Sequence, residues 1–402
     1  MLSGGIWIKE ALHLIGRRPD RVWNSGDCHL MRIKRIRVFH FAAPFVIGFH
    51  SPHRLAKRAD SIILEVEATE GIIGYGECVP RSYITGETCS TVAEIISSIF
   101  PGILLTWEFN SIPDAVRMMS RLESLCRSKS IPAYNAALCA VDIALLDITG
   151  KLLRKPAHAL LGPVVRDMIP SAVSIPFLPI SEYRAVSSEL RKMHFHSYKV
   201  LMGADKEENR HRLRQVRDVM GKEIDLRVEA NGKWSFDQAL SNIEAIKEFN
   251  ISAVEQPLRK DDLEGMRRIR RETGLSVIAD ESLCSPEDAV KLIEEEACDI
   301  LNIKISKCGG LLCSWQISEL ARSKGILCQL GTHVGETGIL TAAGNHLAAV
   351  IRNLTYFENG SHLLFEKKWN SSRSVPVSIH GSGLGGPEIE LPREHTTLLA
   401  EL

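Results

Sequence analysis

Three acidic side chains recur at an almost constant interval in the middle of the chain. Glu229 in DLRVEAN, Glu255 in SAVEQP and Asp280 in SVIADES are 26 and 25 residues apart. Each follows a short apolar run rich in β-branched residues, and a helix-like segment comes after each one. Three carboxylates brought together would repel one another, and a hard divalent cation such as Mg²⁺ removes that repulsion. The spacing therefore predicts a magnesium site with these three residues as ligands.

Further polar side chains stand at matching places before and after these acids. Lys199 lies near the end of the preceding strand-like run, and Lys304 in NIKISK ends the run that follows Asp280. His333 and Glu358 come after the next two runs. A lysine near Mg²⁺ has a lowered pKa and can act as a base close to neutral pH. We predict Lys304, Lys199 and His333 as catalytic residues. His333 could instead be a helix cap or a core histidine, and Glu358 could make only a structural hydrogen bond.

This set of residue types predicts enolisation of a small-molecule carboxylate. The carboxylate oxygens could bind the metal, which would stabilise the enediolate formed when a proton leaves the α-carbon. One outcome is isomerisation, in which Lys304 serves one face of the α-carbon and His333 or a water serves the other. The alternative is a dehydratase acting on an acid sugar, in which one residue takes the α-proton and another protonates the departing hydroxyl.

The interval between the acids fits one strand plus one helix of a β/α barrel. Parallel strands bring their carboxyl ends to one face, where the active sites of such barrels are built. Eight repeats favour a closed barrel over an open sheet, and no glycine-rich nucleotide-binding motif follows any strand. The strand candidates are 171–176, 197–201, 225–230, 252–255, 275–279, 299–304, 326–330 and 354–358, and the helix candidates between them include 205–220, 236–248, 262–273, 286–296 and 312–324.

The first part of the chain has a different pattern. Strand-like alternation over 31–78, with a Thr-Glu-Gly hairpin signal, gives way to helical periodicity at 90–110, 112–128 and 132–153. The predicted fold class is α/β, a TIM-type (β/α)7β barrel with an N-terminal α+β capping domain. The predicted domains are a loosely attached and disordered extension at 1–30, the capping domain at 31–165, the catalytic barrel at 166–370, and a segment at 371–402 that packs back on the capping domain.

Composition excludes several classes of partner. The 402 residues include 49 Lys+Arg and 49 Asp+Glu, and a formal charge of zero gives no reason to expect nucleic acid or an anionic membrane. No apolar stretch approaches the length of a membrane span. The ten cysteines form no C-x-x-C pair, so we predict neither a zinc nor a disulfide framework, and we expect a reducing, cytoplasmic compartment. Whether copies of the chain assemble into a homo-oligomer is left open.

At these residues the chain resembles the enolase superfamily, in the mandelate racemase and muconate lactonizing enzyme branch. The resemblance covers about 31–390 and includes the first-domain stretches GYGECVPRSYITGET and ALLDITGKLLRKP. The barrel motifs VEANGKW, VEQPLRKDDL, IADES and NIKISKCGG are most similar to the muconate lactonizing subgroup, which holds dipeptide epimerases, cycloisomerases and o-succinylbenzoate synthases.

The resemblance implies an isomerase with Mg²⁺ as cofactor, the three acids as its ligands and Lys304 as an acid/base. It also implies that the loops near Phe45–His53 and Ile84–Thr88 cap the substrate. Within this frame Glu358, Asn231 and Thr85 are the predicted substrate-binding residues.

Four positions depart from the family pattern. The third-strand ligand is usually Asp and here is Glu229, and the second-strand Lys-x-Lys motif is here Lys199 followed by Leu201, so the usual base is absent. Dipeptide epimerases carry Asp-x-Asp on the eighth strand, where this chain has Glu358, Asn and Gly. His333 matches the histidine base of the mandelate racemase group, but the strand-6 residue is a lysine instead of that group's aspartate. The loss of the second-strand base adds a third reading, a metal-binding pseudo-enzyme.

Overall fold

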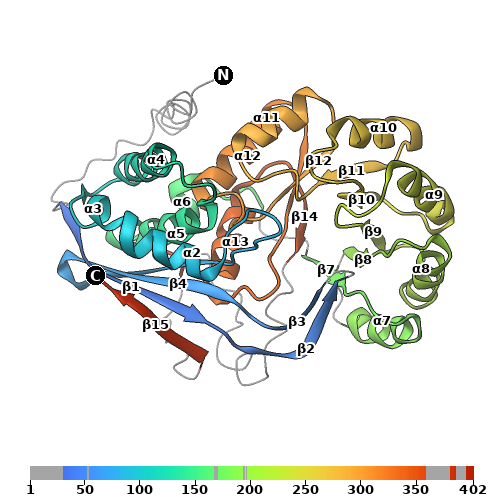
Figure 1. Cartoon of the computed structure of the whole chain (residues 1–402), viewed down its shortest axis with the longest axis horizontal. Helices are drawn as coiled ribbons and strands as arrows, with labels where there is room; N and C mark the ends of the chain where they lie inside the picture. Colours follow the sequence, from blue (N-terminus) through green and yellow to red (C-terminus); the bar gives the residue numbers. More distant parts are fainter. Residues whose placement is uncertain are drawn as a thin grey trace.

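The computed structural model describes residues 30–51, 54–166, 171–192, 195, 197–358, 381–385 and 395–402. Two bodies can be followed in Figure 1: an antiparallel sheet with helices, drawn in blue and teal, and a ring of strands and helices drawn in green to orange. The predicted extension 1–30 lies outside the described residues except for residue 30, as do parts of the loop at 45–53 and of the segment 371–402.

Eight parallel strands close the barrel in the order β10-β11-β12-β13-β14-β7-β8-β9. The residues of these strands are almost entirely buried, as expected for strands that are covered on both faces. This burial explains their apolar sequences. The prediction of the eight strands is confirmed to within a residue or two at each end. The strands are β7 (Ser171–Ile175), β8 (Ser197–Leu201), β9 (Asp225–Glu229), β10 (Ala253–Glu255), β11 (Ser276–Ala279), β12 (Ile300–Ile303), β13 (Leu327–Leu330) and β14 (Leu354–Glu358).

A helix follows each of the first seven barrel strands in the described part of the chain, so the predicted (β/α)7β barrel is confirmed. Five helices begin at a polar cap, where the side chain of Asp205, Ser235, Asp262, Ser285 or Thr337 accepts a backbone hydrogen bond from the first turn. The helices are α7 (Tyr183–Arg191), α8 (Lys206–Met220), α9 (Phe236–Ile246), α10 (Leu263–Thr273), α11 (Pro286–Glu294), α12 (Leu311–Ser323) and α13 (Gly338–Val350).

The capping domain contains an antiparallel sheet in the order β15-β1-β4-β5. Its strands are β1 (Met31–Phe41), β4 (Ser61–Ala68), β5 (Ile73–Cys78) and β15 (Thr396–Glu401). The Thr-Glu-Gly turn joins β4 to β5 through the left-handed residue Glu70, at a φ of 70°. The strand β15, red in Figure 1, comes from the end of the chain and pairs with β1. A separate hairpin, β2 (Pro44–Ser51) and β3 (Arg54–Arg58), leaves the sheet between β1 and β4.

One helix prediction for the capping domain is wrong. The segment 90–110 is not one helix but α2 (Cys89–Glu94), a π-helical turn (Ile95–Ile99), α3 (Pro101–Leu104) and the short strand β6 (Glu108–Phe109). Pro101 has no backbone N–H to donate within a helix, so a new helix begins there. The other two predictions are confirmed as α4 (Ile112–Ser128) and α5 (Asn135–Leu152).

Buried carboxylates join the capping domain to the barrel. Asp142 on α5 accepts hydrogen bonds from the backbone N–H groups of Leu311 and Leu312 at the start of α12. Glu77 on β5 accepts in the same way from Thr337 and Leu340 at the start of α13. A helix N-terminus favours negative charge, so each contact fixes one domain against a helix of the other. No helix in the described ranges has the length and hydrophobicity that a membrane crossing requires.

Candidate active site

The three predicted metal ligands converge at the carboxyl ends of neighbouring strands. Glu229 ends β9, Glu255 ends β10, and Asp280 directly follows β11. One carboxylate oxygen from each lies within 4.8 Å of the others, and all three side chains are buried. A set of three carboxylate oxygens in a buried site suits Mg²⁺, which prefers hard oxygen ligands. The extra methylene of Glu229 therefore does not remove this residue from the cluster.

Glu255 is held by donors from three other strands. Asn302 donates to Glu255 Oε1 over 2.7 Å, and Gln329 donates to Oε2 over 2.9 Å. Lys199 Nζ donates to the same Oε2 over 2.9 Å. Arg227, which is fully buried in the barrel, donates in turn to Gln329. Because these donors come from three different strands and reach both oxygens, the Glu255 carboxylate has little freedom to rotate away from the site.

Lys199 lies inside a cage of carboxylates. Its Nζ is 3.0 Å from Glu229 Oε2 and 2.8 Å from Glu358 Oε1, in addition to the contact with Glu255. Burial lowers the pKa of Lys199, but the three carboxylates outweigh burial and hold the pKa well above its ordinary value. The Lys199 ammonium therefore balances the negative charge of these carboxylates from deeper in the barrel. Glu358 also lies 3.6 Å from Arg227, so this predicted substrate residue is engaged by two cations.

Two lysines approach the third ligand. Lys304 Nζ lies 2.5 Å from Asp280 Oδ2, and Lys307 Nζ lies 2.8 Å from Asp280 Oδ1. Burial raises the pKa of Asp280, yet the two ammonium groups hold it well below its ordinary value. Burial likewise lowers the pKa of Lys304, and the surrounding carboxylates, Asp280 first, raise it well above the usual range. A side chain at Gly331 would collide with Asn302 and crowd Lys304, so this glycine leaves room for both.

The neighbours of Glu229 differ from those of Asp280. Asn231, a predicted substrate-binding residue, donates its side-chain N–H to Glu229 Oε1 and has a left-handed φ of 50°. Burial raises the pKa of Glu229 to about 7, although Lys199 opposes the shift. Burial and the charge of Asp280 also raise the pKa of Glu281 to about 8. Glu281 was missed from the sequence, although it stands directly beside a predicted ligand.

The wall opposite Lys304 is apolar at the mouth. Strands β8 and β12 are four strands apart in a ring of eight, so they face each other across the barrel. Leu201, at the end of β8, pairs in register with Glu229 and is buried. Side chains alternate along a strand, so Leu201 points inward as Lys199 does two residues earlier. The position that the family motif gives to a base is therefore occupied by an inert side chain on the wall that faces Lys304.

His333 lies on the same side of the barrel as Lys304, because β13 is the neighbour of β12. Its backbone N–H donates to the carboxylate of Glu336 over 2.5 Å. Burial holds the pKa of His333 well below its ordinary value, and the charges of Lys304 and Arg81 act in the same direction. The imidazole is therefore neutral at physiological pH.

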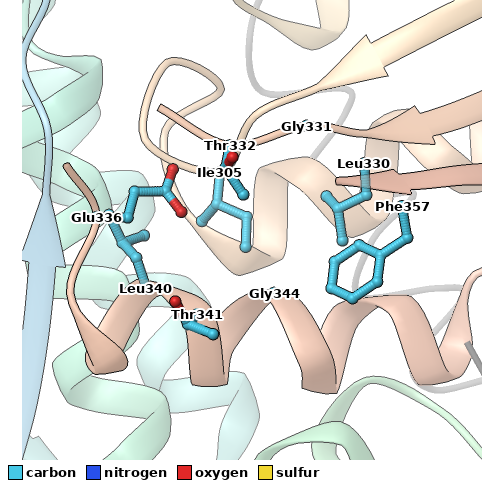
Figure 2. A pocket seen from close by; sticks show the side chains of 9 residues that line it. All are labelled: Ile305, Leu330, Gly331, Thr332, Glu336, Leu340, Thr341, Gly344 and Phe357. Carbon is cyan, nitrogen blue, oxygen red and sulfur yellow. The ribbon is translucent and has the colours of Figure 1, made fainter. Parts of the chain in front are cut away.

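A small cavity lies between α13 and the side of the barrel formed by β12, β13 and β14. Figure 2 shows Glu336 near Thr332 and Ile305 at one end and Phe357 beside Leu330 at the other. Its free space is that of about one water molecule, which is too small for a substrate. Burial raises the pKa of Glu336, which faces this space, to about 8.

The capping domain reaches the barrel mouth through the segment 79–88. Val79 exchanges hydrogen bonds with Ser306, which follows β12, and Arg81 donates to the carbonyl of Val334 over 2.5 Å. Lys260, which follows β10, donates to the carbonyl of Ile84 over 3.1 Å. These contacts hold the predicted capping loop Ile84–Thr88 at the carboxyl face of the barrel. Thr85, a predicted substrate residue in that loop, directs its hydroxyl to the backbone carbonyl of Arg81.

The structure thus brings most of the predicted site residues together and adds others. The predicted lysines, metal ligands, Glu358 and Asn231 form one connected polar cluster, and His333 and Thr85 lie on neighbouring elements. Sequence reasoning missed the residues that hold this cluster. Three of them stand at inward-facing strand positions, one directly follows a predicted ligand, and one lies in the turn three residues after Lys304. These places are the signal that could have found them. They are Arg227, Glu281, Asn302, Lys307 and Gln329.

Comparison with known proteins finds relatives over most of the chain. Residues 32–162 match the mandelate racemase / muconate lactonizing enzyme N-terminal domain, and residues 182–382 match the enolase C-terminal domain-like family. A hydrophobic dipeptide epimerase from Enterococcus faecalis is 32% identical over 81% of this chain and 89% of that protein. An N-succinyl-L-Arg/Lys racemase from Bacillus cereus is 30% identical over 81% of this chain and 85% of that protein.

Solved structures of the same kinds of protein share the fold. The E. faecalis dipeptide epimerase in complex with Mg and the dipeptide L-Leu-L-Tyr has a TM-score of 0.79 and 29% identity, and the match covers 88% of this chain and 99% of that one. The N-succinyl Arg/Lys racemase from B. cereus has a TM-score of 0.81 and 26% identity, covering 92% of this chain and all of that one.

Proposed function

The chain belongs to the mandelate racemase and muconate lactonizing enzyme family of the enolase superfamily, and on that basis we propose that it is a Mg²⁺-dependent isomerase of N-acylated α-amino acids. Glu229, Glu255 and Asp280 would hold the metal, and Lys304 would take the α-proton. The observation that carries the proposal is the buried carboxylate trio with Lys304 Nζ hydrogen-bonded to one of its members.

The relatives support the isomerase class and the kind of substrate. Their names are those of epimerases and racemases, and several act on dipeptides while another acts on N-succinyl amino acids. In both kinds of substrate the amino acid whose configuration changes carries an acyl group on its nitrogen. Mg is present in the solved complexes of three dipeptide epimerases. An α-carboxylate beside an acylated nitrogen is therefore the shared feature that we assign to the substrate.

The neighbourhood of Glu358 favours N-acyl amino acids over free dipeptides. A dipeptide carries an ammonium group that needs an available carboxylate, and the Glu358 carboxylate already contacts Lys199 over 2.8 Å and lies near Arg227. An N-acyl amino acid has no ammonium group and makes no such demand.

The residues of the chain divide the chemical work between them. When bound, Mg²⁺ supplies a fixed positive charge against the substrate carboxylate as negative charge grows there. Lys304 stands beside that site, and in the metal-free protein the carboxylates raise its pKa. Once a bound cation balances those carboxylates, Lys304 would lose its proton more easily and could take the α-proton from its own side of the substrate. Asn302, Gln329 and Lys199 keep Glu255 in place, and Lys199 remains protonated to balance the carboxylate charge. The segment 79–88 lies at the mouth and helps to exclude water.

The apolar β8 wall limits how the reaction can end. Full racemisation with two bases needs one group on each face of the α-carbon, and Leu201 faces Lys304 across the barrel. We therefore expect Lys304 to exchange the α-proton of one antipode rapidly. Inversion needs a proton delivered to the other face, so we expect it to be slower and that proton to come from water.

Solvent exchange tests this function. The protein is incubated in D₂O with Mg²⁺ and with both antipodes of N-succinyl and N-acetyl amino acids, and loss of the α-hydrogen signal is followed by NMR. We expect the α-hydrogen of one antipode to exchange with deuterium and the other antipode to appear slowly. Dipeptides that contain the same amino acids should react more slowly than the N-acyl derivatives. Absence of exchange with every N-acyl amino acid and dipeptide would sink the proposal and favour the pseudo-enzyme.

A dehydratase is the second candidate, because Lys304 and His333 follow adjacent strands. Two groups on one side of a substrate suit removal of a proton and a hydroxyl from the same face. Release of a 2-keto acid from acid sugars, with no isomerisation of amino-acid derivatives, would favour this second function.

A further inference from the structure

Three side chains of the capping domain that do not belong to the carboxylate trio converge, although they are far apart in the sequence. His40 lies near the end of β1, Asp60 directly precedes β4, and Cys89 begins α2. Asp60 Oδ1 lies 2.7 Å from His40 Nε2 and 3.4 Å from Cys89 Sγ. One ligand atom from each residue lies within 4.8 Å of the other two. The side chains are partly exposed, so ions from solution can reach them.

The types of these ligands differ from those in the barrel. An imidazole nitrogen, a sulfur and a carboxylate oxygen are the ligands that Zn²⁺ takes in proteins, whereas Mg²⁺ prefers oxygen alone. Three protein ligands leave a fourth position for water in a tetrahedral site. Because the ligands include one thiolate and one carboxylate, they carry two negative charges, which balance the two positive charges of a divalent cation.

The position of the cluster explains what a metal would do there. The hairpin β2–β3 leaves the sheet after His40 and returns just before Asp60, and the loop Ile84–Thr88 ends at Cys89. A Cβ at Gly335, in the barrel loop after β13, would touch Phe45 and Ala59, so the base of the hairpin packs against the barrel mouth. One metal ion would therefore fasten together the ends of both segments at that mouth.

We propose that His40, Asp60 and Cys89 form a second metal site, selective for Zn²⁺ or a similar borderline cation, which ties the base of the β2–β3 hairpin to the 84–88 loop. Binding replaces the thiol proton of Cys89, which passes to water, and needs no oxidant or reductant. In the metal-free protein, burial and the nearby Asp60 raise the pKa of Cys89 to about 12, so its thiol stays protonated until a metal displaces the proton.

Two guanidinium groups, of Arg81 and Arg58, act on the cluster through space and oppose a cation. Arg81 is already bonded to the carbonyls of Pro80 and Val334. Three direct metal–ligand bonds, two of them from anionic ligands, act at shorter range than this repulsion and should prevail.

Cobalt substitution tests the site without relying on turnover. The full-length protein, with Mg²⁺ in excess to occupy the carboxylate trio, is titrated with Co²⁺. We expect one equivalent to bind with a sulfur-to-cobalt charge-transfer band and intense tetrahedral visible bands, and Zn²⁺ to displace it. Cys89→Ser and His40→Gln should remove the sulfur band or weaken binding at least tenfold. Cys313→Ser, which removes a similarly half-buried thiol on α12, should change neither.

The opposite results are equally clear. Absence of a sulfur-to-cobalt band in the wild type, or its persistence in Cys89→Ser, would overturn the metal site and leave a hydrogen-bonded cluster. Should Cys89→Ser fail to fold, Asp60→Asn serves instead, since it keeps the size of the side chain and removes the charge. Zn²⁺ should also slow hydrogen exchange of the β2 and β3 amides in the wild type and not in Asp60→Asn. Neither readout depends on the proposed isomerase activity.

Discussion

The two walls of the barrel mouth are built in opposite ways. The wall from β9 to β12 carries the three acids and Lys304, and each acid is fixed by hydrogen bonds or ion pairs to its neighbours. The facing end of β8 carries Leu201. In the proposed function the first wall would determine which substrate bond is weakened, because it would hold the metal and the base. The second wall would determine what becomes of the deprotonated substrate, because it would control the supply of a proton to the far face.

Among substitutions in the two walls, removal of Lys304 should have the largest effect on the rate of α-proton exchange. We expect Lys304→Ala to reduce α-proton exchange by about 10²–10⁴-fold, the usual contribution of a positioned general base. Mg²⁺ binding, measured by calorimetry, should persist because the three carboxylates remain. Lys304→Arg keeps the charge but cannot act as a base near neutral pH, so it should lose exchange as well. Exchange within tenfold of the wild type in both variants would move the base to another residue.

Glu255→Gln should have the next largest effect. The amide keeps the shape of the side chain but loses the charge, so Mg²⁺ affinity should fall by at least the ~10–100-fold that even outer-shell partners of a metal contribute. Glu358→Gln is the matched control, because Glu358 is a buried strand-end acid that contacts Lys199 without belonging to the trio. Its Mg²⁺ affinity should change by no more than a few-fold. Equal losses in both variants would contradict the ligand assignment.

Leu201→Lys should reduce the difference between the exchange rates of the two antipodes, because it places an amine on the apolar wall. A lysine on β8 faces Lys304 across the barrel, so exchange of the slower antipode should rise by about tenfold, roughly 1.4 kcal/mol in barrier height. Leu201→Met, which conserves volume, should leave the ratio of the two rates unchanged. Both are followed by NMR in D₂O. If the wild type already exchanged both antipodes equally, the apolar wall would have no influence on stereochemistry.

The difference between the walls was only partly readable from the sequence. The barrel strands and the acids at their ends could be predicted because buried parallel strands give short apolar runs at a regular interval. Leu201 was also visible, since it interrupts a motif. The contacts of Gln329 and Arg227 with the site were not, because they depend on which strands neighbour each other across a closed ring.

The capping domain shows a second reason for missed residues. The absence of any C-x-x-C pair gave no sign of a metal site, because local spacing reveals only ligands that are close in sequence. His40 and Asp60 meet because β1 pairs with β4 in a register that places His40 opposite Ile62. Cys89 joins them through the start of α2, whose predicted extent was itself wrong. Tertiary pairing, which the sequence pattern does not encode locally, therefore creates this cluster.

The smallest expected effect concerns carboxylates outside the walls. Asp280 is paired with lysines, which lower its pKa. Asp142 and Glu77 instead accept from the helix N-termini described above, and Glu87 accepts from the backbone N–H groups of Ala136 and Ala137 at the start of α5. Burial raises the pKa of each of these three carboxyl groups to about 7. For a raised carboxyl pKa the folded state binds more protons than the unfolded state. The free energy of unfolding should therefore fall as pH rises from about 4.5 through 7.

Between pH 6.5 and 8 this loss should be about 1 kcal/mol for each group. Asp142→Asn keeps an acceptor oxygen for the Leu311 N–H but does not titrate, so its stability should fall by about 1 kcal/mol less over the same interval. Histidines such as His346, with a pKa lowered by burial to about 4, shift stability in the opposite direction but equally in both proteins. Denaturant unfolding at the two pH values measures the difference. Identical slopes would mean that Asp142 is already ionised in the folded protein at pH 6.5, so that its helix contacts, like the lysines at the barrel mouth, hold the charge against burial.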